Sequence, residues 1–203
     1  MFMRRFIQLQ FGLCLYGVAA AMMVRANLGL DPWNVFHQGL SLRTGMSLGT
    51  ASILMGVVVM LTWIPLRQKP GIGTLFNIFV IGLSMDAALA VMPEMTTLPP
   101  RLAFMTAGVV LTAVGAAAYI GAGMGTGPRD GLMVGLNQRL GWSIRVSRML
   151  IELSVLAGGW LLGGSVGVGT IVFAVGIGPL IQIFLPWFQA LGRGEKRVAR
   201  ART

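Results

Sequence analysis

Asn27-Leu-Gly-Leu-Asp-Pro-Trp-Asn34 interrupts a long apolar run near the start of the chain. A second interruption, Gly123-Met-Gly-Thr-Gly-Pro-Arg-Asp130, lies 96 residues later and aligns with the first without a gap, so that Pro32 is paired with Pro128. In both stretches a glycine-rich break precedes a proline, a residue favoured at the first position of a helix. These stretches predict one structural unit that is used twice.

The same shift aligns the two halves of the chain along most of their length. Matches between apolar residues count for little in so apolar a sequence, whereas matched glycine, arginine, serine and threonine positions are informative. The matched positions are Arg5 and Arg101, Gly12 and Gly108, Gly29 and Gly125, Arg43 and Arg139, Ser47 and Ser143, Gly73-Thr74 and Gly169-Thr170, and Gly82 and Gly178. The pattern predicts an internal duplication.

The composition indicates an all-α integral membrane protein that passes the bilayer several times. The 203 residues are 55% hydrophobic and only 11% charged, and the mean hydropathy is +0.77. Soluble domains have roughly 25% charged residues. The net charge of +10 comes from basic residues at the ends of apolar runs and in the tail, as expected of orientation signals facing a lipid bilayer. We therefore expect no nucleic-acid partner.

Six segments approach the roughly 20 apolar residues that a membrane-spanning helix needs. The first membrane repeat, residues 1–92, contains predicted spans at 6–24, 47–66 and 71–92, and the second, residues 101–192, contains them at 102–120, 145–162 and 166–187. A short broken or re-entrant helix is predicted after the first span of each half, at 33–42 and 128–140. Residues 93–100 form a hinge, and residues 193–203 form a basic cytoplasmic tail.

Three spans in each half predict an inverted-topology repeat, because an odd number of crossings turns the second half upside down. With both termini inside, Arg25, Arg43 and Arg101 lie outside and the other 13 of the 16 basic residues lie inside. The basic loop at 67–69 aligns with Gly-Gly-Ser at 163–165, as the positive-inside rule predicts for equivalent loops on opposite sides. We expect a bacterial plasma (inner) membrane protein with both termini cytoplasmic.

The two breaks are the predicted binding site. In an inverted repeat, the short helices approach from opposite faces and direct free backbone N–H groups and positive dipole ends towards a shared cavity. Such a cavity suits a small polar or anionic solute. The alternative is that the breaks only turn the chain and let helices pack closely. The candidate ligand-binding residues are Asp31, Pro32, Trp33, Asn34, His37, Gly127, Pro128, Arg129, Asp130 and Glu152.

Several polar and aromatic residues within the spans have two readings each. Glu152 follows Arg148 by four positions, so it either serves the site or forms an ion pair along its own helix. Asp86 and Asn77 either line the cavity or lie at the outer interface. Trp33 is placed to stack on a ligand. We expect four other tryptophans to anchor span ends in the headgroup region: Trp63, Trp142, Trp160 and Trp187.

Metal, cofactor and enzyme chemistry find no support in the sequence. Cys14 is the single cysteine and His37 the single histidine, whereas transition-metal sites normally gather three or four ligands. No paired nucleophile and base is visible. We expect no cofactor, no metal and no enzymatic activity.

The motifs Gly29-Leu-Asp-Pro-Trp-Asn-Val, Gly45-Met-Ser-Leu-Gly-Thr and Gly71-Ile-Gly-Thr-Leu resemble the bacterial YczE/YyaS/YitT-like family of small multi-pass membrane proteins. The resemblance covers nearly the whole chain except the basic tail. It implies a bacterial plasma-membrane protein and supplies no catalytic residues.

A small-solute transporter or permease is the function that the sequence favours, with its site at the two Gly-Pro breaks. Two alternatives stay open: a non-transporting membrane regulator or scaffold that signals through the basic tail, and a substrate-binding subunit of a larger importer. The sequence also leaves open the solute, the coupling ion and the formation of a homo-oligomer.

Overall fold

The computed structural model describes residues 2–193, which form nine α-helices and no β-strand. This confirms the all-helical prediction. Residues 194–203 of the predicted tail lie outside the described residues. The helices are α1 (Phe2–Ala26), α2 (Pro32–Thr44), α3 (Leu48–Leu61), α4 (Trp63–Leu66), α5 (Ile72–Val91), α6 (Leu98–Ala122), α7 (Pro128–Leu140), α8 (Ile144–Leu161) and α9 (Val168–Arg193).

Five helical stretches are long and apolar enough to cross a membrane. They are Phe2–Ala26, Leu48–Leu66, Ile72–Val91, Leu98–Ala122 and Val168–Ala190. The stretch Leu48–Leu66 joins α3 and α4, which are separated at Thr62. Helix α8 has 18 residues, but Arg145, Arg148 and Glu152 make it more polar than the others. The chain is a membrane protein with several apolar helices.

Corresponding helices in the two halves start at positions 96 residues apart. This holds for α1 and α6, α2 and α7, α3 and α8, and α5 and α9. The same local chemistry sets the boundaries: the hydroxyl groups of Ser47 and Ser143 cap α3 and α8, while Gly45 and Gly141 end α2 and α7 in the left-handed conformation. The predicted hinge is shorter than expected, because α6 begins at Leu98 and Pro99 lies in its first turn instead of near the end of the hinge.

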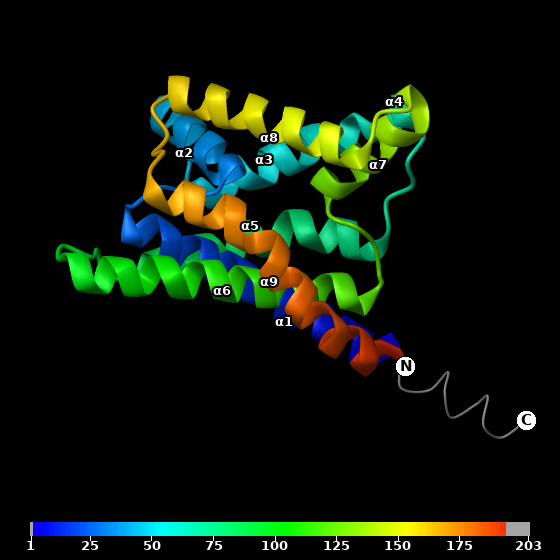
Figure 1. The fold of residues 1–203 in the computed structure, drawn as a ribbon, viewed down its shortest axis with the longest axis horizontal. Coiled ribbons are helices and arrows are strands. Elements are labelled where there is room, and N and C mark those ends of the chain that lie inside the picture. Colours follow the sequence, from blue (N-terminus) through cyan, green and yellow to red (C-terminus); the bar gives the residue numbers. More distant parts are fainter. Residues whose placement is uncertain (1, 194–203) are drawn as a thin grey trace, which may run out of the picture.

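Helices α1 and α6 lie along one side of the molecule, and α2, α3, α4, α7 and α8 lie along the opposite side, with α5 and α9 between them (Figure 1). The packing of α1 on α6 is close because small residues meet there. A Cβ atom at Gly12 would lie 2.8 Å from the carbonyl oxygen of Gly115, and one at Gly108 would lie 3.0 Å from that of Ala19. These contacts are reciprocal, since residues 19 and 115 are themselves 96 positions apart.

Two arginines repeat this reciprocity at the helix ends. Arg5 donates from Nε to the carbonyl of Ala122 at 2.6 Å, and Arg101 donates from Nε to the carbonyl of Ala26 at 2.8 Å. Each arginine thus supplies donors to the free carbonyls at the end of the other helix. The start of each helix therefore lies beside the end of its counterpart, and α1 and α6 run antiparallel.

The two breaks are held in the same reciprocal way. Asn27 and Gly123 have positive φ angles of 49° and 60°, which turn the chain away from the preceding helix. The carbonyl of Leu28 then accepts a hydrogen bond from Gly169 N at 2.7 Å, and that of Met124 accepts one from Gly73 N at 2.9 Å. Each break is bound to the start of the last long helix of the opposite half, which fixes where α2 and α7 begin.

The halves differ in how closely α3 and α8 approach the following long helix. A Cβ atom at Gly82 of α5 would lie 2.6 Å from the carbonyl oxygen of Gly49 in α3, so these two helices are in tight contact. The equivalent Gly178 of α9 would meet no atom of the described residues within 4 Å. The fold is therefore asymmetric beside α8.

Candidate functional site

A cavity of about 260 Å³ lies between the two halves, and every described helix except α4 contributes to its wall. All of the residues predicted to bind a ligand line it: Asp31, Pro32, Trp33, Asn34, His37, Gly127, Pro128, Arg129, Asp130 and Glu152. The two breaks therefore converge on one space. Their glycines also allow close packing, so the packing reading is confirmed and the binding of a ligand stays a prediction.

The first-half wall is a hydrogen-bonded chain of three side chains. Asp31 caps α2, because its Oδ1 accepts from Asn34 N at 3.3 Å and its Oδ2 accepts from Asn34 Nδ2 at 2.5 Å. The other amide atom, Asn34 Oδ1, lies 3.1 Å from His37 Nδ1. Since an amide oxygen can only accept, Nδ1 of His37 carries the proton. Its Nε2 is then an acceptor, and it has no hydrogen-bond partner among the described residues.

The second-half wall is built around the start of α7. The hydroxyl of Tyr119 donates to Asp130 Oδ2 at 3.1 Å. Trp63 donates from Nε1 to the carbonyl of Pro128 at 3.0 Å, and its ring lies where a side chain at Gly131 would be. Trp63 is 3% exposed, so the prediction of a headgroup anchor was wrong for this residue. Its indole is needed to satisfy a buried carbonyl at the break.

Arg129 and Trp33 join the two walls. The guanidinium carbon of Arg129 lies 4.5 Å from the centroid of the Trp33 ring, within the range of a cation–π contact. These residues occupy equivalent positions in the two halves. The face of Trp33 that was predicted to stack on a ligand therefore carries Arg129.

Burial and the charge of Arg129 both shift the pKa values of the titratable groups at the breaks. Burial raises the pKa of Asp31 and of Asp130, and the positive charge of Arg129 opposes that rise. Burial also lowers the pKa of His37 well below its ordinary value, with Arg129 acting in the same direction. The lowered pKa agrees with the single proton assigned to Nδ1 of His37.

Helix α8 brings a charged pair to the cavity. Arg148 Nε lies 2.9 Å from Glu152 Oε1, and both residues line the space. The predicted ion pair is thus present, and Glu152 also lines the cavity, while its role in binding stays a prediction. The equivalent positions on α3 are Ser52 and Gly56, which also line the cavity but carry no charge.

Asp86 and Asn77 have different surroundings. Asp86 accepts hydrogen bonds from Ser47 Oγ at 2.5 Å and from Gly49 N at 2.7 Å, so it secures the start of α3 and is not a cavity residue. Asn77 lines the cavity.

Sequence reasoning missed two tyrosines of the cavity wall, Tyr16 and Tyr119. Each lies within a long apolar run, and the repeat gives no signal because Tyr16 aligns with Thr112 and Tyr119 with Met23. The only signal in the sequence was that each tyrosine places a polar hydroxyl inside a predicted span. Within residues 2–193, no group of three or more His, Cys, Asp or Glu side chains could hold a metal ion.

Comparison with known proteins gives relatives without an assigned activity. The sequence matches the Family of unknown function (DUF6198) over residues 3–186. It is 42% identical over 177 residues to an uncharacterised protein of Haemophilus influenzae, covering 87% of this chain and 81% of that protein. It is 34% identical to the uncharacterised membrane protein YczE of Bacillus subtilis (84% and 80% covered) and 25% identical to the uncharacterised protein YyaS of the same organism (86% and 89%). No solved structure matches.

Proposed function

The chain belongs to this family of unknown function, and we propose from its own cavity that it is a transporter or permease for a small polar solute. The observation that carries the proposal is the convergence of the two helix starts, Pro32 and Pro128, on one cavity with polar walls. Broken helices that direct their ends at a shared central site are the usual binding arrangement of transporters built from inverted repeats. The proposal is transport without an enzymatic reaction.

The proposed topology is six spans arranged as a 3+3 inverted repeat, with α8 as the span whose charges face the cavity. The antiparallel contact of α1 with α6 supports it, because the first helices of the two halves then cross the membrane in opposite directions. The shared helix starts support the duplication itself. Burying charged residues such as Arg148 and Glu152 against lipid is costly, which favours a cavity-facing role for their side of α8.

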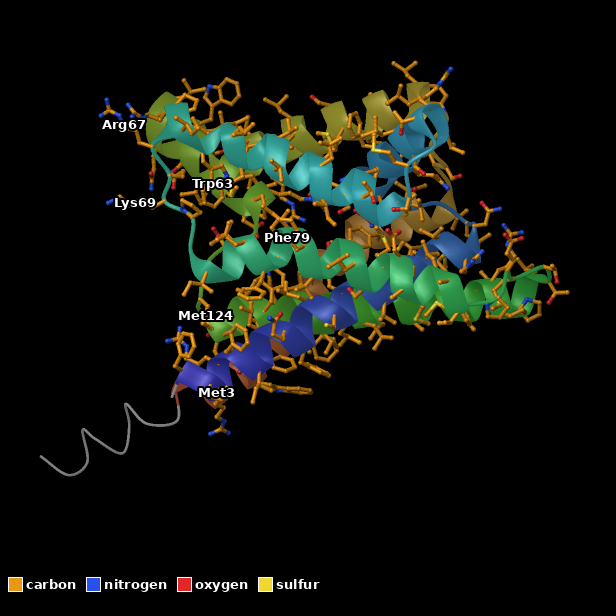
Figure 2. All side chains as sticks on the ribbon, turned by 180° about the vertical axis from the view of Figure 1, so that it is seen from behind. Met3, Trp63, Arg67, Lys69, Phe79 and Met124 are labelled. Carbon is orange, nitrogen blue, oxygen red and sulfur yellow. The ribbon has the colours of Figure 1, made fainter. Side chains whose placement is uncertain are left out.

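We place both termini in the cytoplasm of a bacterial cell, with the protein in the plasma membrane. Met3 and Met124 lie at the same end of the molecule as the side chains of Arg67 and Lys69 (Figure 2). Positive residues mark the cytoplasmic side, so this end is assigned to the cytoplasm. Arg129 and Arg148 line the cavity and carry no information on orientation. The remaining basic residues are still more numerous on the side assigned to the cytoplasm.

Release from sealed liposomes tests transport across many solute classes at once. The purified protein is reconstituted into liposomes that enclose a defined mixture of sugars, amino acids, amines and carboxylic acids, and mass spectrometry follows the contents over time. We expect faster release of one solute class than from protein-free liposomes.

Two arginines of α7 provide a matched pair of variants for this assay. Arg129→Gln removes the cation that joins the cavity walls, so release should slow at least tenfold. Arg139→Gln makes the same change at an exposed position at the end of the helix and should release at the wild-type rate. Release by the wild type that is no faster than from protein-free liposomes would refute the proposal, and so would equal release rates for Arg129→Gln and the wild type. A scaffold or regulator predicts the first of these results.

A further inference from the structure

We infer that the cavity recognises a protonated amine on its solute, an inference that rests on the proposed transport function for the role of the cavity. It departs from the anionic alternative among the polar and anionic solutes that the helix dipoles suggested. Both helix starts already have a carboxylate of their own: Asp31 caps α2, and Asp130 lies in the first turn of α7. An anion at the start of α2 would compete with the capping carboxylate of Asp31, and one at the start of α7 would lie near the negative charge of Asp130.

The charged groups of the cavity favour a cation. Asp31, Asp130 and Glu152 line it together with only two basic residues, Arg129 and Arg148. Arg148 is paired with Glu152, and Arg129 faces the ring of Trp33 and forms no hydrogen bond or salt bridge within the described residues. The three carboxyl groups thus outnumber the two guanidinium groups, so the ionised side chains of the lining carry a formal charge of one negative unit.

His37 adds an acceptor that has no other partner among the described residues. The residue is 1% exposed and lines the cavity. Its Nδ1–H is committed to Asn34, so the free Nε2 can only accept a hydrogen bond. Leaving a buried acceptor unsatisfied is unfavourable, and a donor on the solute would satisfy it. An ammonium group supplies positive charge and several donors at once.

The size and the apolar part of the wall limit the rest of the solute. A volume of about 260 Å³ has room for a small organic solute. Met55, Met133, Phe173, Ile177 and Ile181 line the remaining surface and suit a short carbon chain. A small aliphatic amine satisfies both requirements.

Two matched pairs of probes isolate the amine. The first pair is 4-aminobutanol and 1,4-butanediol, and the second is γ-aminobutyrate and γ-hydroxybutyrate. Within each pair an ammonium group replaces a hydroxyl on the same carbon chain, and only the second pair carries a carboxylate. Binding to the purified protein in detergent is measured by titration calorimetry. We expect the amine of each pair to bind at least tenfold more tightly, since hydrogen bonds to charged groups are the stronger kind.

Two aspartates that both secure helix starts supply the variants. Asp31→Asn keeps a capping side chain but removes a cavity charge, so it should weaken amine binding at least tenfold. Asp86→Asn makes the same change in an α5 residue whose carboxylate secures the start of α3, away from the cavity. This variant should bind the amines like the wild type. Equal affinities within either pair of probes, no binding by any probe, or equal weakening by both variants would overturn the inference.

The binding and release experiments distinguish a failure of the inference about the amine from a failure of the proposed transport function. If the amines bind as expected but no solute leaves the liposomes, the recognition of an amine holds and transport is wrong. If the liposomes release only sugars or carboxylic acids and the amines do not bind, transport holds and the inference about the solute is wrong.

Discussion

Replacing Gly12 with alanine tests whether the close contact of α1 with α6 holds the two halves together. A Cβ atom at this position would lie 2.6 Å from the backbone nitrogen of Tyr119 and 2.8 Å from the carbonyl oxygen of Gly115. Ordinary contact begins at 3.4 Å, so the helices must separate by up to about 0.8 Å, and gaps of about 0.5–1 Å forfeit a quarter to a half of each neighbouring van der Waals contact. Overpacking of this kind costs roughly 1–3 kcal/mol.

Helix propensity acts in the opposite direction, because alanine is favoured over glycine by about 1 kcal/mol within a helix. Gly176→Ala in α9 is the matched control. Its Cβ atom would meet its nearest neighbours at 3.9 Å, so it gains the same propensity without a clash. The difference between the two variants is therefore the steric cost alone, about 1–3 kcal/mol.

The assay is unfolding of the purified protein in mixed micelles with increasing sodium dodecyl sulfate, followed by circular dichroism. The free energy of unfolding of Gly12→Ala should lie below that of Gly176→Ala by the steric cost. If the two variants are equally stable, the close contact at Gly12 does not limit the packing of the halves, and the reasoning fails.

Three further predictions use the same unfolding assay. Arg101→Ala should lower the free energy of unfolding by about 1.5–3 kcal/mol, because the carbonyl of Ala26 loses a charged donor. Arg101→Lys should recover less than half of this loss, since an ammonium lacks the guanidinium fork. Full recovery by lysine would contradict this. Trp63→Phe should lower the free energy of unfolding by about 1–3 kcal/mol, because it leaves a buried carbonyl unsatisfied. Trp160→Phe, at a residue that is 65% exposed, should change it by less than about 0.5 kcal/mol. Similar losses in the two variants would count against the Trp63 hydrogen bond. Cys14→Ala, at a thiol that no other helix covers, should also stay within about 0.5 kcal/mol; a larger loss would show that Cys14 packs against a neighbour.

The fold could be predicted from the sequence because its strongest signals are local. Apolar runs of sufficient length indicate spanning helices, and the Gly-Pro breaks indicate where α2 and α7 begin. The helix starts at Pro32 and Pro128 fall where the first-position proline places them. The boundary near Pro99 was misplaced by a few residues because its prolines were assigned to the end of a hinge, although proline is equally suited to the first turn of a helix.

The duplication predicts cavity residues only where both halves carry a matching feature, whereas His37 and Glu152 were predicted from their chemistry and their place in the sequence. The shift of 96 residues directs attention to Trp33 with Arg129 and to Asn34 with Asp130. It gives no signal for Tyr119, whose counterpart is a methionine, or for Trp63, whose counterpart is Gly159. Their roles depend on which helix of the other half lies opposite, and that arrangement is a property of packing.

That the ten candidate residues surround one space is a finding of the structure, while the binding of a solute by them stays a prediction. The expectation of a polar or anionic solute came from considering the helix dipoles without the side chains. Asp31 at a cap and Asp130 in a first turn were visible in the sequence, and they weigh against a second negative charge at the same places.

The reciprocal contacts of Arg5 and Arg101 are those of an isologous interface, in which two copies of one surface meet about a two-fold axis. Two separate copies of such a half would have to present the same side chain on both sides of every contact. Joining the halves in one chain removes that requirement. Position 56 can then be glycine while position 152 is glutamate, and the cavity gains a single acid that a symmetric pair would carry twice or not at all.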